Sequence, residues 1–153
     1  MYSTSFNPPL RYVVVCIANA TEIIMVDAVV DTGARYTCFR ANTINPMLLE
    51  KDFIHLPHRD FGGFVDGKNK TQQMRFYQYH LKQFTIGNID MGVQDIWITF
   101  DTRISDNVLG MDILQSIDFL QYRNTGRIIF FQNKAELVKY VTNDTKYEAY
   151  REA

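Results

Sequence analysis

The chain has 153 residues, 46% of them hydrophobic and 14% aromatic, which is enough to build the core of one globular domain and argues against disorder. Its 16 basic and 17 acidic residues give a formal net charge of −1, without the basic excess that is typical of nucleic-acid-binding proteins. No apolar run approaches the roughly 20 residues that cross a bilayer. We therefore expect no nucleic acid and no membrane among its partners.

The N-terminus and the two cysteines bear on location. Residues 1–6 lack the basic start and the apolar core of a secretion signal. Cys16 and Cys38 are too few for a disulfide framework, and each lies in an apolar setting, so we expect buried free thiols. These features predict a cytoplasmic protein.

The first thirty residues predict an arm and a hairpin. Residues 1–10, which include two prolines, are expected to form an extended arm. The β-branched residues of 11–17 predict a strand, and 23–30 predict its return strand after a turn at 18–21. This hairpin ends immediately before Asp31.

Asp31 directly follows the apolar run 28–30 and is itself followed by Thr32 and Gly33. The β-branched residues of the run favour a strand, and Gly33 allows the backbone to turn sharply. Asp31 is therefore expected where a buried strand breaks into a tight loop, a position where a carboxylate can serve in acid–base chemistry.

The segment 55–81 predicts a long hairpin with a glycine-rich, polar tip. It follows an expected short strand at 36–39 and an expected short helix within 42–51 that carries an early proline. The tip of the hairpin can lie at Gly62 and Gly63 or at Asp66 and Gly67. The candidate tip residues are Gly62, Gly63, Phe64, Val65, Asp66 and Gly67.

The remaining segments complete an all-β, barrel-like domain. Strands are expected at 81–86 and 93–100, and a closing hairpin at 119–131. Between them, Val108, Leu109 and Gly110 lead into an expected short helix at 111–116. From residue 133 the composition shifts, and apolar residues alternate with charged ones in a way that favours a terminal helix, with a frayed tail as the alternative.

Two of these motifs together resemble the aspartic peptidases, and the retropepsins in particular. The first motif is Asp31, Thr32, Gly33 and Ala34, and the second is Val108, Leu109 and Gly110. The resemblance covers residues 10–132. It implies an all-β, retropepsin-like closed barrel of short strands with a flap hairpin, forming a peptidase domain over 1–132, with 133–153 as a C-terminal extension.

The resemblance also implies a role for each motif residue. Asp31 is the expected catalytic residue, Thr32 is expected to hydrogen-bond across a dimer axis, and Gly33 lets the backbone approach the catalytic pair. Ala34 keeps the next position small, and Gly110 lets the helix pack behind the loop. The hairpin is expected to close as a flap over bound peptide, and the N-terminal strand to contribute to a subunit interface. No metal or other cofactor is implied.

Aspartic peptidases use two aspartates that share one proton, whereas this chain has a single Asp-Thr-Gly. A second Asp-Thr sequence, at Asp101 and Thr102, does not repeat the motif, because Arg103 stands in place of the glycine. We therefore expect a homodimer that hydrolyses a peptide or protein substrate between paired Asp31 residues. Arg35 departs from the viral pattern of acidic or small residues, and is expected either to lower the aspartate pKa or to contact substrate.

Three alternatives stay open from the sequence. The chain can be a retropepsin-like dimerisation or peptide-binding module with little or no catalysis. Asp31 can be a turn-capping acid in a non-enzymatic barrel. His55 and His58, with Asp60 and His80, can be read as a metal site, but Pro57 interrupts their spacing and surface histidines are the favoured interpretation.

Overall fold

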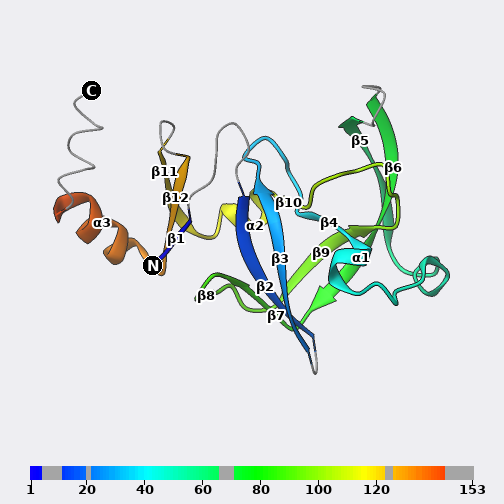
Figure 1. Ribbon diagram of the computed structural model, residues 1–153, viewed down its shortest axis with the longest axis horizontal. Coiled ribbons are helices and arrows are strands. Elements are labelled where there is room, and N and C mark those ends of the chain that lie inside the picture. Colours follow the sequence, from blue (N-terminus) through cyan, green and yellow to red (C-terminus); the bar gives the residue numbers. More distant parts are fainter. Residues whose placement is uncertain (5–11, 20–21, 66–70, 123–125, 144–153) are drawn as a thin grey trace.

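The computed structural model describes residues 1–4, 12–19, 22–65, 71–122 and 126–143, and they form a mostly-β protein (Figure 1). The strands are β1 (Tyr2–Thr4), β2 (Tyr12–Asn19), β3 (Glu22–Val30), β4 (Cys38–Arg40), β5 (His58–Val65), β6 (Thr71–Leu81), β7 (Gln83–Ile86), β8 (Ile89–Asp90), β9 (Gln94–Thr99), β10 (Val108–Leu109), β11 (Asp118–Tyr122) and β12 (Arg127–Phe131). The helices are α1 (Ala41–Ile44), α2 (Met111–Leu114) and α3 (Lys134–Asn143), with a 3-10 turn η1 at Glu50–Asp52.

The strands form two sheets. One has three strands in the order β1-β12-β11, and the other has nine in the order β5-β6-β9-β4-β10-β3-β2-β7-β8. Figure 1 shows the small sheet and α3 at one end of the molecule and the β5–β6 hairpin at the other. Among the described residues no pairing joins the edge strands β5 and β8, so the closed barrel expected from the sequence is not observed.

The middle of the large sheet brings the two sequence motifs together. β3 pairs antiparallel with β2 along its whole length. On its other side it pairs in parallel with β10, with Val29 opposite Val108 and Val30 opposite Leu109. The end of β3 therefore lies beside the end of β10, although their residues are far apart in the sequence.

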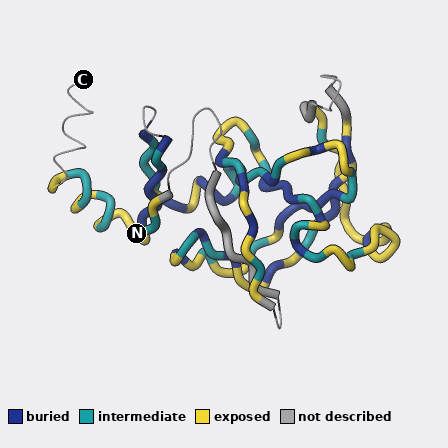
Figure 2. The backbone as a smooth tube through the Cα atoms, in the orientation of Figure 1, coloured by how far each residue is buried: buried dark blue, intermediate teal, exposed yellow. Residues whose placement is uncertain are grey.

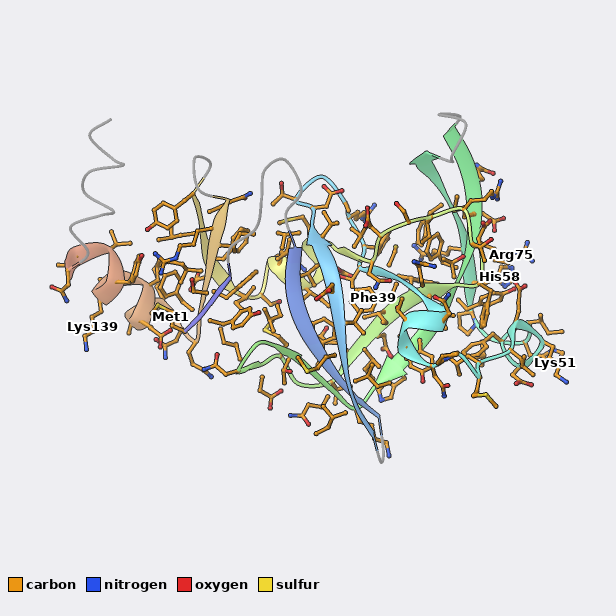
Figure 3. The ribbon with its side chains drawn as sticks, viewed as in Figure 1. Met1, Phe39, Lys51, His58, Arg75 and Lys139 are labelled. Carbon is orange, nitrogen blue, oxygen red and sulfur yellow. The ribbon has the colours of Figure 1, made fainter. Side chains whose placement is uncertain are left out.

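The core is continuous through the centre of the molecule (Figure 2). Phe39, labelled in Figure 3, is fully buried in it and packs near Phe84. The side chains of β12 pack into two separate cores, because successive side chains point to opposite faces of a strand. Ile128 and Phe130 are in or beside the main core, whereas Ile129 and Phe131 face a separate cluster that α3 covers with Leu137 and Tyr140.

Most of the expected strands are confirmed within a residue or two, and the C-terminal helix is present as α3. The helix expected within 42–51 was wrong in extent: α1 begins one residue earlier and ends at Ile44. Asn45 has φ −158° and ψ 115°, as expected for a residue that precedes a proline, because the ring of Pro46 disfavours the helical region there. The short strand β8 was not predicted.

Some expectations lie outside the described residues. These are the arm from residue 5 to residue 10, most of the first turn, the hairpin tip at 66–70 and the chain beyond Asn143. In the described part of the chain no helix is both long and apolar enough to cross a membrane.

Candidate active site

Asp31 is the first residue after β3, and its side chain is exposed. Its backbone N–H donates to the carbonyl of Leu109 at 3.1 Å, which extends the β3–β10 pairing by one residue. Two bonds then close the loop: the Ala34 N–H donates to the Asp31 carbonyl at 3.1 Å, and the Gly33 N–H donates to Asp31 Oδ1 at 2.9 Å. The carboxylate is thus held at the rim of the sheet in one orientation.

A buried asparagine positions β10 against β3. The Asn107 carbonyl accepts from the Val29 N–H at 2.7 Å, and its side-chain Nδ2 donates to the Asp27 carbonyl at 3.1 Å. Its Oδ1 accepts from the Arg40 N–H at 2.7 Å. Buried polar groups are stabilising when they are satisfied in this way, so Asn107 ties three strands together behind the loop.

A second network joins the loop to the start of α2. Thr37 Oγ1 donates to Asp112 Oδ1 at 2.6 Å and accepts from the Gly110 N–H at 3.0 Å. The Thr37 N–H donates to Asp112 Oδ2 at 3.0 Å. In the other direction, the N–H groups of Met111 and Asp112 donate to the carbonyls of the loop residues 34 and 35 at 2.8 and 3.1 Å.

Gly110 packs against this loop more closely than any other residue type allows. A Cβ atom built on it would lie 2.5 Å from the carbonyl carbon and oxygen of Tyr36 and 3.0 Å from the carbonyl oxygen of Ala34. These are backbone atoms, which cannot rotate away. The absence of a side chain at Gly110 therefore allows the helix and the loop to make contact.

Asp31 lines a pocket with a volume of about 520 Å³. The wall is built from five segments of the chain: the loop, the start of β4, β5, the stretch before β10, and β10 itself. The lining residues are Asp31, Gly33, Ala34, Arg35, Tyr36, Cys38, Phe61, Gly62, Ile104, Ser105, Asp106 and Val108. A carboxylate thus stands in a cavity that both apolar and polar side chains line, which is the general form of a ligand-binding site.

The β5–β6 hairpin reaches the pocket through Phe61 and Gly62. The register of the hairpin shifts between Phe61 and Phe64, so that two residues of β5 oppose one residue of β6. The residues in the shift are Gly62 and Gly63, and a bulge of this kind bends its strand. Phe64 and Val65 continue β5, while Asp66 and Gly67 lie outside the described residues.

Aromatic and cationic side chains form one wall of the pocket. The ring of Tyr36 stacks on Phe61 with centroids 5.2 Å apart and meets Trp97 edge-on at 6.3 Å. The Arg35 guanidinium lies 5.4 Å from the centre of the Tyr36 ring, and Arg59 lies 5.7 Å from it. Arg59 Nη1 also donates to the Tyr36 hydroxyl at 3.0 Å.

Cys38 lies at the base of the pocket as a buried free thiol, as the sequence predicted for it. Burial, reinforced by the negative charge of Asp112, raises the pKa of this thiol to about 12. It is therefore protonated at neutral pH and is not a reactive nucleophile.

The histidines do not form a metal centre in the described part of the chain, where no three potential ligands of the His, Cys, Asp and Glu types converge. His80 instead pairs with Asp95 at 2.8 Å on the exposed side of β6 and β9. His58 packs near the ring of Tyr77.

The structure adds site residues that sequence reasoning missed. Ile104, Ser105 and Asp106 line the pocket. Their position just before the second motif could have indicated that they lie at the site. The partnership of Thr37 with Asp112 spans 75 residues and had no local signal. Thr32, expected from the first motif, is exposed beside Asp31.

Comparison with known proteins gives no match to any protein-family model and none to a curated protein sequence. Solved structures do match. A retropepsin-like aspartic protease from Rickettsia conorii superposes with a TM-score of 0.57 at 13% identity, over 84% of this chain and 87% of that one. The retroviral protease-like domain of Ddi1 from Leishmania major gives a TM-score of 0.49 at 16% identity, over 84% and 99%. The first similarity shows that this chain has a retropepsin-like fold.

Proposed function

We propose that this protein is an aspartic endopeptidase that acts as a homodimer, with Asp31 as its catalytic residue. One observation carries the proposal: in a retropepsin-like fold, Asp31 stands exposed in the pocket, on a loop that β10 and α2 hold from behind. A carboxylate held rigidly in a cavity is suited to positioning and activating water.

The dimer follows from the chemistry of paired carboxylates. Two carboxylates about 3 Å apart share one proton, which gives one acid and one base. The chain supplies one such carboxylate, so a second copy must supply the other. Residues 1–132 would form the peptidase domain, and 133–153 an extension that includes α3.

The proposed reaction needs no covalent intermediate. The ionised Asp31 takes a proton from water, the oxygen of that water bonds to the carbonyl carbon of the peptide, and Asp31 of the partner subunit donates its proton to the carbonyl oxygen. In the resulting diol, the amide nitrogen then accepts a proton from the first Asp31, the C–N bond breaks, and one diol hydroxyl returns its proton to Asp31 of the partner subunit. An amine and a carboxylic acid leave, and the pair again holds one proton.

The β5–β6 hairpin is the proposed flap. Phe61 and Gly62 already line the pocket, and the glycine bulge beside them allows the strand to bend. Closure over a bound peptide would exclude water from the cleft and strengthen the interactions of the carboxylates.

Digestion of a denatured protein mixture tests the proposal. Wild type, Asp31→Asn and Asp101→Asn are incubated at high concentration between about pH 4 and 7, and new peptide ends are mapped by mass spectrometry. Asp101→Asn is the matched control, because Asp101 also precedes a threonine but its carboxylate is paired with Arg103 at 2.6 Å. We expect cuts with wild type and the control only.

The same experiment addresses the non-catalytic alternative. Equal patterns of cuts from all three proteins would mean a contaminating protease and would overturn the assignment of Asp31. An absence of cuts from all three would favour a dimerisation or peptide-binding module.

A further inference from the structure

We propose that the pocket selects peptides with an acidic side chain, bound by Arg35 with help from Tyr36 and Arg59. The inference deepens the proposed function and rests on it, because it names the substrate class of the same pocket. It starts from Arg35, which is exposed and lines the pocket together with Asp31.

Two cations converge on one aromatic residue of the pocket wall. The guanidinium carbons of Arg35 and Arg59 lie 5.4 and 5.7 Å from the centre of the Tyr36 ring, and Arg59 lies 5.5 Å from Trp97. Stacking on an aromatic ring orients a guanidinium without using its hydrogen-bond donors. These side chains are therefore ordered in advance of binding.

Neither arginine is neutralised within the described part of the chain, where no carboxylate lies within ion-pair distance of Arg35 or Arg59. Other exposed arginines are paired: Arg75 lies 3.2 Å from Asp60, and Arg103 lies 2.6 Å from Asp101. Two guanidinium groups without a carboxylate partner among the described residues therefore lie at the pocket.

The Tyr36 hydroxyl adds a neutral donor to the two cations. It accepts a hydrogen bond from Arg59, and no acceptor for its own proton is found among the described residues, so it can donate to an incoming oxygen. A carboxylate has two oxygens that accept several hydrogen bonds, and it matches the planar fork of a guanidinium. An aspartate or glutamate side chain of the substrate fits this set of donors.

Asp106 is a second carboxylate in the pocket, besides Asp31. It lies on the stretch before β10, where the Ser105 hydroxyl is 3.3 Å from its Oδ2, and not on the loop that carries Arg35. The preference for an acidic side chain is therefore expected at one subsite, on the Arg35 side, and not along the whole cleft.

Peptide binding to the Asp31→Asn protein tests the inference independently of catalysis. A degenerate peptide library with Glu, Gln or Lys fixed at one position at a time is equilibrated with this protein, and the bound peptides are quantified. We expect Glu to be enriched about tenfold over Gln at one position, as a charge-assisted interaction implies. Adding Arg35→Gln should abolish the enrichment, and Arg35→Glu should favour Lys instead.

Three further variants control for charge and folding. Lys82→Gln removes the same charge from an exposed residue that does not line the pocket and should keep the enrichment. Arg59→Gln should reduce it partly, and Arg35→Lys should retain part of it. The inference would be overturned if the Asp31→Asn protein bound no peptide or bound peptides without enriching Glu. It would also be overturned if the enrichment stayed the same after Arg35→Gln. Failure of the peptidase proposal would instead appear as absence of wild-type cleavage.

Discussion

The two sides of the Asp31 loop differ sharply in how they are built. On the pocket side Asp31, Gly33 and Arg35 are all exposed. On the opposite side Thr37 and Gly110 are buried, and no buried side-chain nitrogen or oxygen of the described residues lacks a hydrogen-bond partner. The pocket side carries the residues of the proposed active site and the opposite side supports their loop, so substitutions on the two sides should be separable into effects on activity and effects on stability.

The largest effect on stability is expected from Gly110→Ala, compared with the same change at Gly33. The new Cβ at Gly110 meets backbone atoms at 2.5 Å, whereas at Gly33 it meets only Asp31 Oδ1, at 3.2 Å. Denaturant unfolding should show a loss of about 3 kcal/mol for Gly110→Ala and less than about 1 kcal/mol for Gly33→Ala. Gly33→Ala should instead lower kcat/KM about tenfold, because the carboxylate must shift.

Equal losses of stability from the two glycine substitutions would contradict the distinction between the sides. Retention of full activity by Gly33→Ala would show that the position of the carboxylate is not sensitive to its own loop.

The next largest effect is expected from Thr37→Val, which leaves the buried Gly110 N–H without its partner and removes one of the two hydrogen bonds to Asp112 Oδ1. The free energy of unfolding should fall by about 2 kcal/mol. Thr142→Val is the control, because that hydroxyl is exposed and donates only to the Val138 carbonyl within α3. The control should change the free energy of unfolding by less than about 0.5 kcal/mol. If Thr37→Val lost no more stability than the control, the hydrogen bonds of Thr37 would not stabilise the fold.

An effect confined to alkaline pH is expected from Cys38. Burial raises the pKa of its thiol from 9.0 to about 12, so the unfolded chain loses this proton first. The stabilisation is fully present below pH 9 and is lost progressively as the pH rises towards 12. Between pH 9 and pH 12 the free energy of unfolding should therefore fall more steeply for wild type than for Cys38→Ala, when each protein is compared with its own value at pH 7. Parallel curves would refute the raised pKa.

The smallest effect is expected from Arg103→Gln, on the exposed loop that carries the second Asp-Thr sequence. Arg103 lowers the pKa of Asp101 by hydrogen bonding, so the pair contributes above the ordinary pKa of 3.8 and the contribution is lost as pH falls further. Because the pair is on the surface, stability at pH 7 should change by less than about 0.5 kcal/mol. Activity should be unchanged, and a large loss of activity would mean that this loop belongs to the site.

Local patterns in the sequence were sufficient to place most strands and Asp31. The apolar run before Asp31 and the glycine after it define the strand end, and the pairing of β3 with β10 joins the two motifs. The resemblance to retropepsins was needed to connect these motifs, since no local signal links residues so far apart.

The sequence could not reveal contacts that depend on the completed fold. Thr37 and Asp112 are ordinary polar residues in the sequence and become partners only when α2 docks on the loop. Arg59 likewise reaches Tyr36 only because β5 lies across the pocket from the loop. The closed barrel was expected from the resemblance, but the strand pairing of the described residues leaves β5 and β8 as edges.

The central claim is that two copies of Asp31 form one catalytic site, and a subunit-mixing titration of peptidase activity tests it most directly. Wild type and Asp31→Asn are unfolded together, refolded in varied ratio at constant total concentration, and assayed on one cleaved peptide. If both aspartates are needed, an equal mixture retains about one quarter of the wild-type activity, because only pairs of wild-type subunits are active. Retention of about one half would mean that each subunit works alone and would contradict the paired site.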